Sequence, residues 1–399
     1  MLEYLIINLD SIPREFVALF GMFLLFIGTK FFQRYHVPSA ISAVALGALS
    51  NVFYPWAGQD HLLSTFSILG ISSLFLFAGL EVEIDEIKNS KKQLLLISAA
   101  YLIFLFVTQL AVSRIFGISP GAAWIAALGI LTPSAGFILE NVGIHFSDAD
   151  KQAWVKQTTI SLEIVSLAVL FFIVQSSSIA RLFFSVILMV SLVVLLPRLF
   201  RLFARVILPY APKTEFSFLI LIACTMAMVT KALGVYYLVG AFFVGVTARP
   251  FIRTLPKDDS EKLTHAIDVF SAFFVIFYFF SAGTRISMEN LTPDAFLVGF
   301  LGALFFIPMR LAFVSMFNKA HSSSLSPESW KSGMVMVPTL VFGLVMLGIL
   351  REKFNAPSNL LGGLLVYTAI TTVLPGAIRA RTTRRSARET SAIAREPTR

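Results

Sequence analysis

Long apolar stretches, separated by short breaks rich in charge, Pro or Gly, recur along the whole chain. A stretch of ~20 apolar residues is long enough for an α-helix to cross the ~30 Å hydrocarbon core of a bilayer. No segment alternates apolar and polar residues over ~10 positions, as the strands of an outer-membrane barrel do. The pattern therefore predicts an all-α polytopic membrane protein with about thirteen transmembrane helices. Their expected extents are 15–33, 39–56, 61–80, 93–115, 120–141, 154–175, 179–208, 214–230, 234–248, 262–282, 294–318, 330–350 and 358–378.

The composition supports this class. Of the 399 residues, 57% are hydrophobic and 14% are charged, whereas a soluble domain carries roughly 25% charged residues. The first ten residues include Glu3 and Asp10 but no basic residue, so we expect the first helix to remain rather than be cleaved as a signal peptide. The single cysteine, Cys224, excludes an internal disulfide and a cysteine-based metal site.

The formal net charge of +9 arises largely from the loops and the tail beside the predicted helices. If the N-terminus lies outside, the inner loops and the C-terminal tail hold most of the 32 lysines and arginines, as the positive-inside rule requires. This predicts an odd number of spans in the cell (inner or plasma) membrane, with the N-terminus outside and the C-terminus in the cytoplasm. The placement indicates the lipid bilayer as partner, and no nucleic acid.

The chain changes character after the predicted membrane domain, residues 1–378. Residues 379–399 are polar, Arg-rich and free of aromatic side chains, so we expect a disordered cytoplasmic tail there. Two interpretations of this basic tail stay open: an orientation signal that lies against anionic lipid, or a regulatory segment.

Two features at nearly the same spacing indicate an internal repeat. Segments 77–84 and 281–288, at the ends of the third and tenth spans, each follow a Phe-rich stretch, contain an Ala-Gly pair and lie 204 residues apart. Pro133 in the fifth span and Pro338 in the twelfth lie 205 residues apart. With the seventh span as a linker, spans 1–6 correspond to spans 8–13. The third and tenth spans cross in opposite directions, so we expect two inverted repeats.

The same two prolines interrupt apolar stretches. Thr132, Pro133 and Ser134 break the fifth span, and Pro338 and Thr339 break the twelfth. Proline removes a backbone donor, and neighbouring Gly, Ser and Thr ease local unwinding. A single helix with such a break could equally be an ordinary proline-kinked helix. Because lipid tolerates irregular backbone only around a cavity or inside protein, two breaks in corresponding places favour a binding site at the midplane.

Two charged residues lie deep within predicted helices. Glu163 is near the middle of the sixth span, where a lone carboxylate is costly and must face a cavity, pair or stay protonated. Burial favours its protonated form and a cation favours its charged form, so one group can hold either a proton or a monovalent metal ion. The alternative is a structural glutamate bonded to a neighbouring helix. Arg310, in the eleventh span, stays protonated and is either a counter-charge for the unwound region or a purely structural pair.

Other polar residues are weaker candidates for a binding or catalytic site. Glu81, Glu83 and Glu140 lie at inner ends of spans, where we expect solvated acids, with cation attraction as the alternative. No nucleophile, base and orienting group cluster at one membrane face, so we expect no enzyme and no cofactor. The histidines are scattered through loops: His36, His61, His145, His265 and His321.

In this order and spacing, four segments resemble the monovalent cation:proton antiporter-2 family, a branch of the sodium/proton exchangers, in its Kef-type form without a cytosolic nucleotide-binding domain. They are FLFAGLEVEIDEI at 75–87, ILTPSAGFILENVG at 130–143, the Glu163 segment, and VGAFFVGV at 239–246 with FFSAGTRISM after it. The resemblance covers nearly all of residues 15–378. It implies a homodimer in which spans 1–3 and 8–10 form the dimerisation part, spans 4–6 and 11–13 the core, and span 7 the linker.

The resemblance also implies that spans 5 and 12 cross at the ion site. Glu163 would then bind the ion or proton beside Thr132, Pro133 and Ser134, and Arg310 would be the basic residue of the eleventh span. The sequence departs from the family at Leu162-Glu163, where an aspartate usually follows a polar or acidic residue. The twelfth span also lacks an acid that is often found near its break. One carboxylate implies electroneutral exchange, and its extra methylene either changes the preferred ion or signals another substrate.

The preferred hypothesis is thus a secondary antiporter that exchanges Na⁺ or K⁺ for H⁺ by an elevator-type motion. One alternative keeps the fold but carries an organic anion, whose carboxylate helix N-termini and Arg310 would bind. The other is a membrane sensor or assembly subunit that transports nothing.

Overall fold

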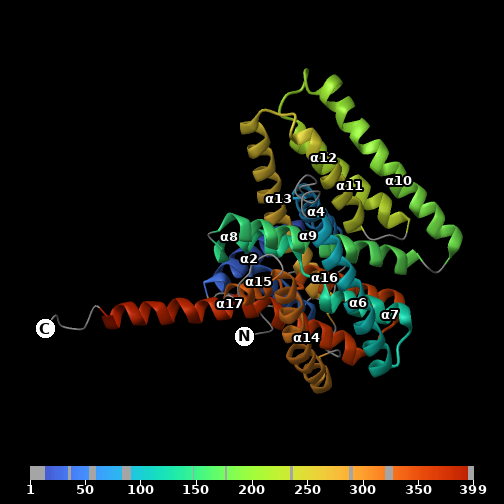
Figure 1. Ribbon diagram of the computed structural model, residues 1–399. Coiled ribbons are helices and arrows are strands. Elements are labelled where there is room, and N and C mark those ends of the chain that lie inside the picture. The colour runs from blue at the N-terminus through green and yellow to red at the C-terminus, as the bar shows by residue number, and fades with distance from the viewer. Residues whose placement is uncertain are drawn as a thin grey trace.

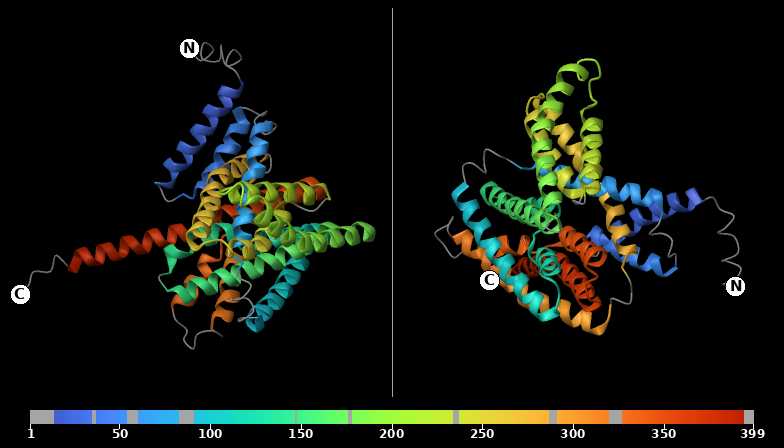
Figure 2. Two further views of the ribbon diagram at one scale, coloured as in Figure 1. Left: turned by 90° about the horizontal axis from the view of Figure 1, so that it is seen from above. Right: turned by 90° about the vertical axis from the view of Figure 1, so that its right-hand side faces the viewer.

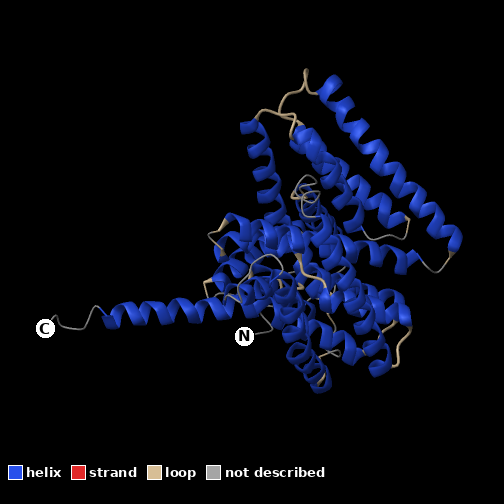
Figure 3. Ribbon diagram, in the orientation of Figure 1, coloured by secondary structure: helices blue, strands red, loops and turns tan. Residues whose placement is uncertain are grey.

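The computed structural model describes residues 14–34, 37–53, 60–82, 91–146, 148–175, 178–233, 237–286, 291–319 and 327–393. Every regular element within these residues is a helix (Figure 3), as the apolar pattern predicts. The short η3 is a π-helical turn that continues α10. In chain order the elements are α2 (Arg14–Gln33), α3 (Ser39–Phe53), α4 (His61–Leu80), α6 (Lys91–Phe116), α7 (Pro120–Leu131), α8 (Ala135–His145), α9 (Ala149–Gln175), α10 (Ile179–Leu202), η3 (Phe203–Ile207), α11 (Glu215–Ala232), α12 (Tyr237–Ile252), α13 (Lys257–Thr284), α14 (Pro293–Lys319), α15 (Pro327–Val335), α16 (Leu340–Phe354) and α17 (Ser358–Ile393).

Each predicted span coincides with one helix or, for the fifth and twelfth, with a pair of helices. Among the described residues, nine helical segments are long and apolar enough to cross a membrane, and three shorter apolar helices lie at 20–33, 39–50 and 237–252. The prediction of an all-α polytopic membrane protein is confirmed, while the count of about thirteen crossings stays a prediction.

The C-terminal residues differ from the prediction. Residues 379–399 were expected to be disordered, but α17 continues through Ile393, and its last turns project away from the bundle (Figure 1). The physical reason lies in local composition. No Gly or Pro follows Gly376 before Ile393, and Ala and Arg are strong helix formers.

Several predicted features lie outside the described residues. These are the N-terminal segment with Glu3 and Asp10, the last residues of the second span, the first residues of the ninth, Glu83, the end of the repeat segment at 287–288, and the tail after residue 393.

The two Ala-Gly pairs of the repeat mark helix crossings. A Cβ atom on Gly79 of α4 would come within 2.9 Å of the Cα atom of Gly245 on α12. A Cβ atom on Gly283 of α13 would come within 3.0 Å of the backbone nitrogen of Ala48 on α3, beside Gly47. Each glycine thus lets the third helix of one repeat lie backbone to backbone against the second helix of the other. This reciprocal arrangement is what inverted repeats predict.

Helix contacts divide the bundle into two groups. In the first helix group, α3, α4, α12 and α13 pack most closely, with α2 against α3 and α11 against α12. In the second helix group, α14 packs on α17, α7 on α6 and α16, and α8 on α9. Figures 1 and 2 show α10, α11 and α12 on the side of the molecule opposite to α6, α7 and α14. Large apolar side chains on α10 and α14, such as Phe183 and Phe300, are exposed, as in helices that face lipid.

Candidate ion-binding site

The first break lies between α7 and α8. The helix ends at Leu131, and Thr132 and Ser134 adopt extended backbone, with ψ angles of 121° and 97°. Pro133 explains the break, because it has no N–H to donate and its ring disfavours helical backbone at the preceding residue. The predicted interruption of the fifth span is therefore an open stretch of three residues.

The second break lies between α15 and α16. The helix ends at Val335, the chain continues without helical structure through Pro338, and α16 begins after Thr339. As in the first break, a proline occupies the middle of the open stretch.

The two breaks contact each other directly. The backbone N–H of Ser134 donates to the carbonyl oxygen of Pro338 at 2.9 Å. The backbone N–H of Val341, in the first turn of α16, donates to the hydroxyl of Ser134 at 3.4 Å. Backbone groups that the breaks would leave unpaired are thereby satisfied across the two repeats.

Arg310 of α14 holds the carboxyl-terminal ends of both broken helices. Its guanidinium donates to the carbonyl oxygen of Ile130 at 3.3 Å, of Val337 at 2.6 Å and of Met336 at 2.9 Å. Tyr367 of α17 donates to the same Ile130 oxygen at 2.9 Å. Helix C-termini carry partial negative charge, so a buried, permanently charged guanidinium is stabilised there. Both interpretations of Arg310, a counter-charge for the unwound region and a purely structural pair, remain predictions.

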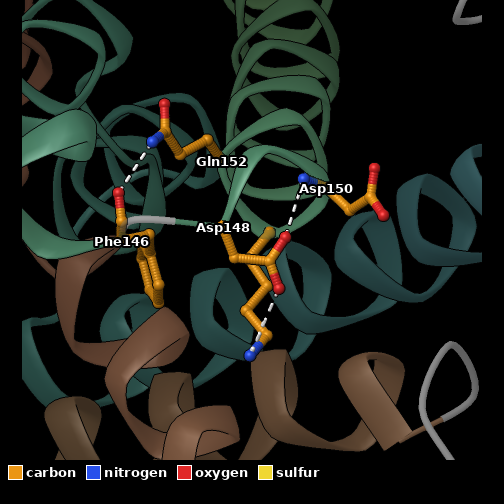
Figure 4. Close-up of polar contacts among 5 residues, drawn as sticks. Phe146, Asp148, Asp150 and Gln152 are labelled. Carbon is orange, nitrogen blue, oxygen red and sulfur yellow. Dashed lines mark hydrogen bonds and ion pairs between the residues drawn. The ribbon is translucent and has the colours of Figure 1, made fainter.

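Glu163 comes from α9, whose start is held by local contacts (Figure 4). Asp148 caps the helix by accepting from the N–H of Asp150 at 3.0 Å, and its carboxylate lies 3.5 Å from the Lys151 ammonium. Gln152 donates to the carbonyl oxygen of Phe146 at 2.7 Å, which ties α9 to the end of α8. These contacts fix where the α9 axis begins relative to the first break.

The Glu163 carboxyl group lies at the start of α8 and is only 1% exposed. It accepts a hydrogen bond from the backbone N–H of Ala135, the first residue of α8, where the helix dipole is positive. Its Oε2 atom is buried and has no hydrogen-bond partner among the described residues. A buried carboxyl oxygen without a partner is costly. The Glu163 carboxyl group is therefore a candidate site for a proton or a cation.

Hydroxyl groups surround the first break. Tyr101 of α6 donates to Thr132 at 3.1 Å, and Thr132 donates to Ser166 at 3.0 Å. Ser166 in turn donates to the carbonyl oxygen of Leu162 at 2.8 Å. Thr159, one turn before Glu163, has a buried hydroxyl with no partner in the part of the chain that the structure describes. Thr159, Glu163 and Ser166 recur at helical spacing and so share one face of α9.

Not all predicted site residues play the same part. Thr132, Pro133, Ser134 and Pro338 form the contacting breaks, whereas Thr339 lies at 3.2 Å from Thr371 of α17. Sequence reasoning missed five hydroxyl groups, because polar residues of this size are common in apolar helices. The repeat spacing, applied to Glu163, was the one signal that would have found Tyr367. The missed residues are Tyr101, Thr159, Ser166, Tyr367 and Thr371.

The arrangement suits a hard monovalent cation. Carboxylate, hydroxyl and carbonyl oxygens are the ligands that such ions prefer. In the described residues no group of three or more His, Cys, Asp or Glu side chains could hold a metal ion. Any cation at this site would thus be held by Glu163 with hydroxyl and backbone oxygens, and its charge would replace that of one proton.

An apolar layer covers the site on the side of the first helix group. Leu74 of α4 packs against Gly136, where a Cβ atom would come within 3.0 Å of the leucine Cγ. The ring of Phe75 lies 6.4 Å from that of Phe342 on α16. α4 therefore touches both broken helices just beyond their breaks.

Comparisons with known proteins agree with this architecture. The model of a sodium/hydrogen exchanger transmembrane family matches residues 21–383. A solved structure of the sodium proton antiporter MjNhaP1 from Methanocaldococcus jannaschii at pH 8 is similar over 92% of this chain and 96% of its own, with a TM-score of 0.65 and 14% identity. An electron-microscopy map of the same antiporter is similar over 96% and 99%, with a TM-score of 0.61 and 14% identity. No curated protein matches the sequence.

At 14% identity, these structures show a shared fold. The family match extends over most of the chain and confirms the predicted resemblance to cation:proton antiporters, while assignment to the second branch of that group stays a prediction. The protein is accordingly a multi-pass membrane transporter and not an enzyme. The chain belongs to the sodium/hydrogen exchanger family.

Proposed function

We propose that this chain, a cation/proton antiporter by its family, exchanges Na⁺ or K⁺ for protons at one carboxylate, that of Glu163. The observation that carries the proposal is the buried Oε2 atom of Glu163, which has no partner in the described part of the chain and lies beside the two contacting breaks. Leaving such an atom unpaired costs free energy. A proton or a cation removes that cost, and either one excludes the other.

Competition for one group couples the two fluxes. When the carboxyl group is protonated it is neutral, so the cost of a buried negative charge is removed. When a cation arrives, the proton leaves, and the oxygens of Glu163, Thr132 and Thr159 are available as ligands. One proton is exchanged for one cation charge, so the cycle is electroneutral. Leu162 supports this, because the residue before Glu163 adds no second carboxylate. Arg310 keeps its charge throughout.

The helix packing supports an elevator-type motion. The first helix group is locked by backbone contacts at Gly79 and Gly283, which favours a fixed scaffold. The second helix group carries the breaks and Glu163. Near the breaks it meets the scaffold through apolar contacts such as that of Leu74 with Gly136, whereas the Glu81–Lys156 and Arg285–Glu352 ion pairs join the groups at the helix ends. Apolar surfaces slide past each other more readily than hydrogen-bonded ones do. On this proposal α10 is the linker, the scaffold forms a homodimer, and the chain has its N-terminus outside and its C-terminus in the cytoplasm of the cell membrane.

Neither alternative function has a specific observation in its favour. An organic anion would need donors from Arg310, but that guanidinium is bound to the carbonyl oxygens of Ile130, Met336 and Val337. A sensor without transport would not need a buried carboxyl oxygen that is left unpaired at a helix break.

The test is cation-driven proton movement in proteoliposomes that hold a pH gradient and a trapped pH dye. We expect Na⁺ or K⁺ to dissipate the gradient with wild-type protein and not with Glu163→Gln. The matched control is Glu261→Gln, the same change at an exposed acid that pairs with Lys257 at 3.9 Å. This control should keep wild-type flux. Flux that persists in Glu163→Gln would contradict the proposal, and a rate that changes with membrane potential would contradict electroneutrality.

A further inference from the structure

A cleft opens at the end of the molecule where α4 begins and where α13 and α16 end. It has a volume of about 90 Å³ and lies between the two helix groups. α4 lines it with Ser64 and Ser67, α13 with Ser281, and α16 with Leu344 and Gly348. With Tyr237 and Tyr278, five hydroxyl-bearing residues line this cleft, which makes it wettable, unlike the layer below it.

The cleft leads along α16 towards the candidate ion site. Leu344 lies one turn from Leu340, where α16 begins beside the second break. Ile71 of α4 lines the cleft. One turn further along α4, the ring of Phe75 lies against that of Phe342 and closes the cleft towards the ion site. The cleft thus ends at the apolar layer that separates it from Glu163.

The rim of the cleft is basic. Among the described residues, the charged side chains that line it are Lys231 at the end of α11, Arg285 after α13, Arg351 on α16 and one acid, Glu352. The Arg285 guanidinium lies 3.6 Å from the Glu352 carboxylate, and Arg351 donates to the Arg285 carbonyl oxygen. Both side chains of the ion pair are about half exposed, so they remain at the mouth rather than in the wall.

The repeat reverses this charge at the other end of the molecule. Arg285 stands 204 residues after Glu81, the spacing that also relates the two Ala-Gly pairs. Glu81 follows α4 and lies 3.5 Å from Lys156 of α9. Equivalent positions therefore carry a base at the mouth of the cleft and an acid at the opposite face, and each pairs with a helix of the second group.

We propose that this cleft is the outer entrance to the ion site and that its basic rim weakens the binding of monovalent cations from that side. The inference rests on the proposed function, because it assigns an access route to the Glu163 site. Fixed charges of one sign at the mouth of a low-dielectric cleft shift the local concentration of ions. Cations are depleted at this mouth, and added salt screens the effect.

The experiment measures electrostatics at the cleft without requiring transport. Cys224→Ser removes the only cysteine, and Gly348→Cys places a new one in the cleft. A Cβ atom at Gly348 meets nothing within 4 Å, so this substitution fits without repacking. The thiol is then labelled from the outside of cells with an anionic sulfonatoethyl methanethiosulfonate or a cationic trimethylammonium-ethyl methanethiosulfonate. The control thiol is Ala180→Cys, at an exposed position on α10 outside the cleft.

At each cysteine we compare the labelling rate of the anionic reagent with that of the cationic one. We expect this ratio to be about tenfold higher at position 348 than at position 180. Arg351→Gln should reduce this preference about threefold, Glu352→Gln should increase it, and high salt should abolish it. Equal preferences at the two positions, labelling only from the cytoplasmic side, or no labelling of Gly348→Cys would each overturn the inference. If labelling is as expected but wild-type protein in liposomes shows no cation-driven proton flux, the result would instead count against the proposed function.

Discussion

Tyr367 stands 204 residues after Glu163, at the equivalent position of the second repeat, and its hydroxyl donates to Ile130 at the end of α7. Glu163 in turn accepts from Ala135 at the start of α8. The two repeats therefore place an acid beside a helix N-terminus and a phenol beside a helix C-terminus. On the proposed function only the first exchanges a proton for a cation, because an ordinary phenol titrates near pH 10 and keeps its proton. One titrating group would then serve both repeats.

If protons and cations compete for Glu163, the apparent KM for the cation depends on pH. A rise in pH removes the competing proton, so we expect KM to fall by about tenfold per pH unit while the carboxyl group is mostly protonated. Proteoliposome assays over a pH series measure this slope. Glu261→Gln should show the same slope as the wild type, and a KM that does not change with pH would exclude competition at one site.

Removing the guanidinium of Arg310 should destabilise the crossing. Arg310→Gln leaves the buried carbonyl oxygens of Met336 and Val337 without their donor, so we expect the free energy of unfolding to fall by about 2–4 kcal/mol. Thermal unfolding in detergent measures the change. Arg198→Gln is the matched control, because Arg198 is exposed and, within the described residues, bonds to Val194 of its own helix alone. An equal loss in both variants would show that the bonds of Arg310 are unimportant for stability.

Tyr101→Phe should weaken cation binding with little effect on folding. It deletes the hydroxyl that donates to Thr132 and contacts Ser166, so the proposed ligand Thr132 loses its fixed orientation. We expect the apparent KM to rise by about 3- to 10-fold, equivalent to the ~1 kcal/mol of one hydrogen bond. Tyr210→Phe, at a residue that is 89% exposed, should leave KM unchanged. An unchanged KM in Tyr101→Phe would show that this hydroxyl network does not contribute to cation binding.

Alanine at either repeat glycine should separate tightly packed backbones. Gly79→Ala and Gly283→Ala each place a methyl group against the backbone of the facing helix, so we expect a loss of about 1–3 kcal/mol or more in the free energy of unfolding. Gly143→Ala is the control, because it is exposed on α8 with nothing within 4 Å of its added Cβ. That change should be neutral or slightly stabilising, since Ala favours helix over Gly by up to ~1 kcal/mol. Similar effects at all three positions would contradict the crossing geometry.

The parts of the molecule that sequence reasoning anticipated are those coded locally. Pro133 and Pro338 break their helices wherever these helices pack, because the missing N–H is a property of the residue itself. Glu163 and Arg310 stand out because a charge within an apolar stretch is rare. The Ala-Gly pairs were found as a repeat, and their role as crossing points required the structure.

The remaining site residues depend on how the helices are rotated about their axes. Tyr101, Ser166 and Thr371 reach the breaks only because their helices turn those faces towards them. A hydroxyl in an apolar helix also bonds readily to its own backbone. The end of α17 was missed for another reason. Its charge suggested disorder, whereas helix propensity between Ile378 and Ile393 determined the local structure.

One guanidinium binds carbonyl groups from both α7 and the segment after α15, so on the proposed elevator motion the two halves of the crossing shift together. A cation held at Glu163 would then travel inside an unchanging cage. Its intrinsic dissociation constant would be the same whichever compartment the cage faces. Any difference in apparent affinity between the two compartments would be a property of the mouths through which the ion passes, and the two can be altered by mutation independently of the cage.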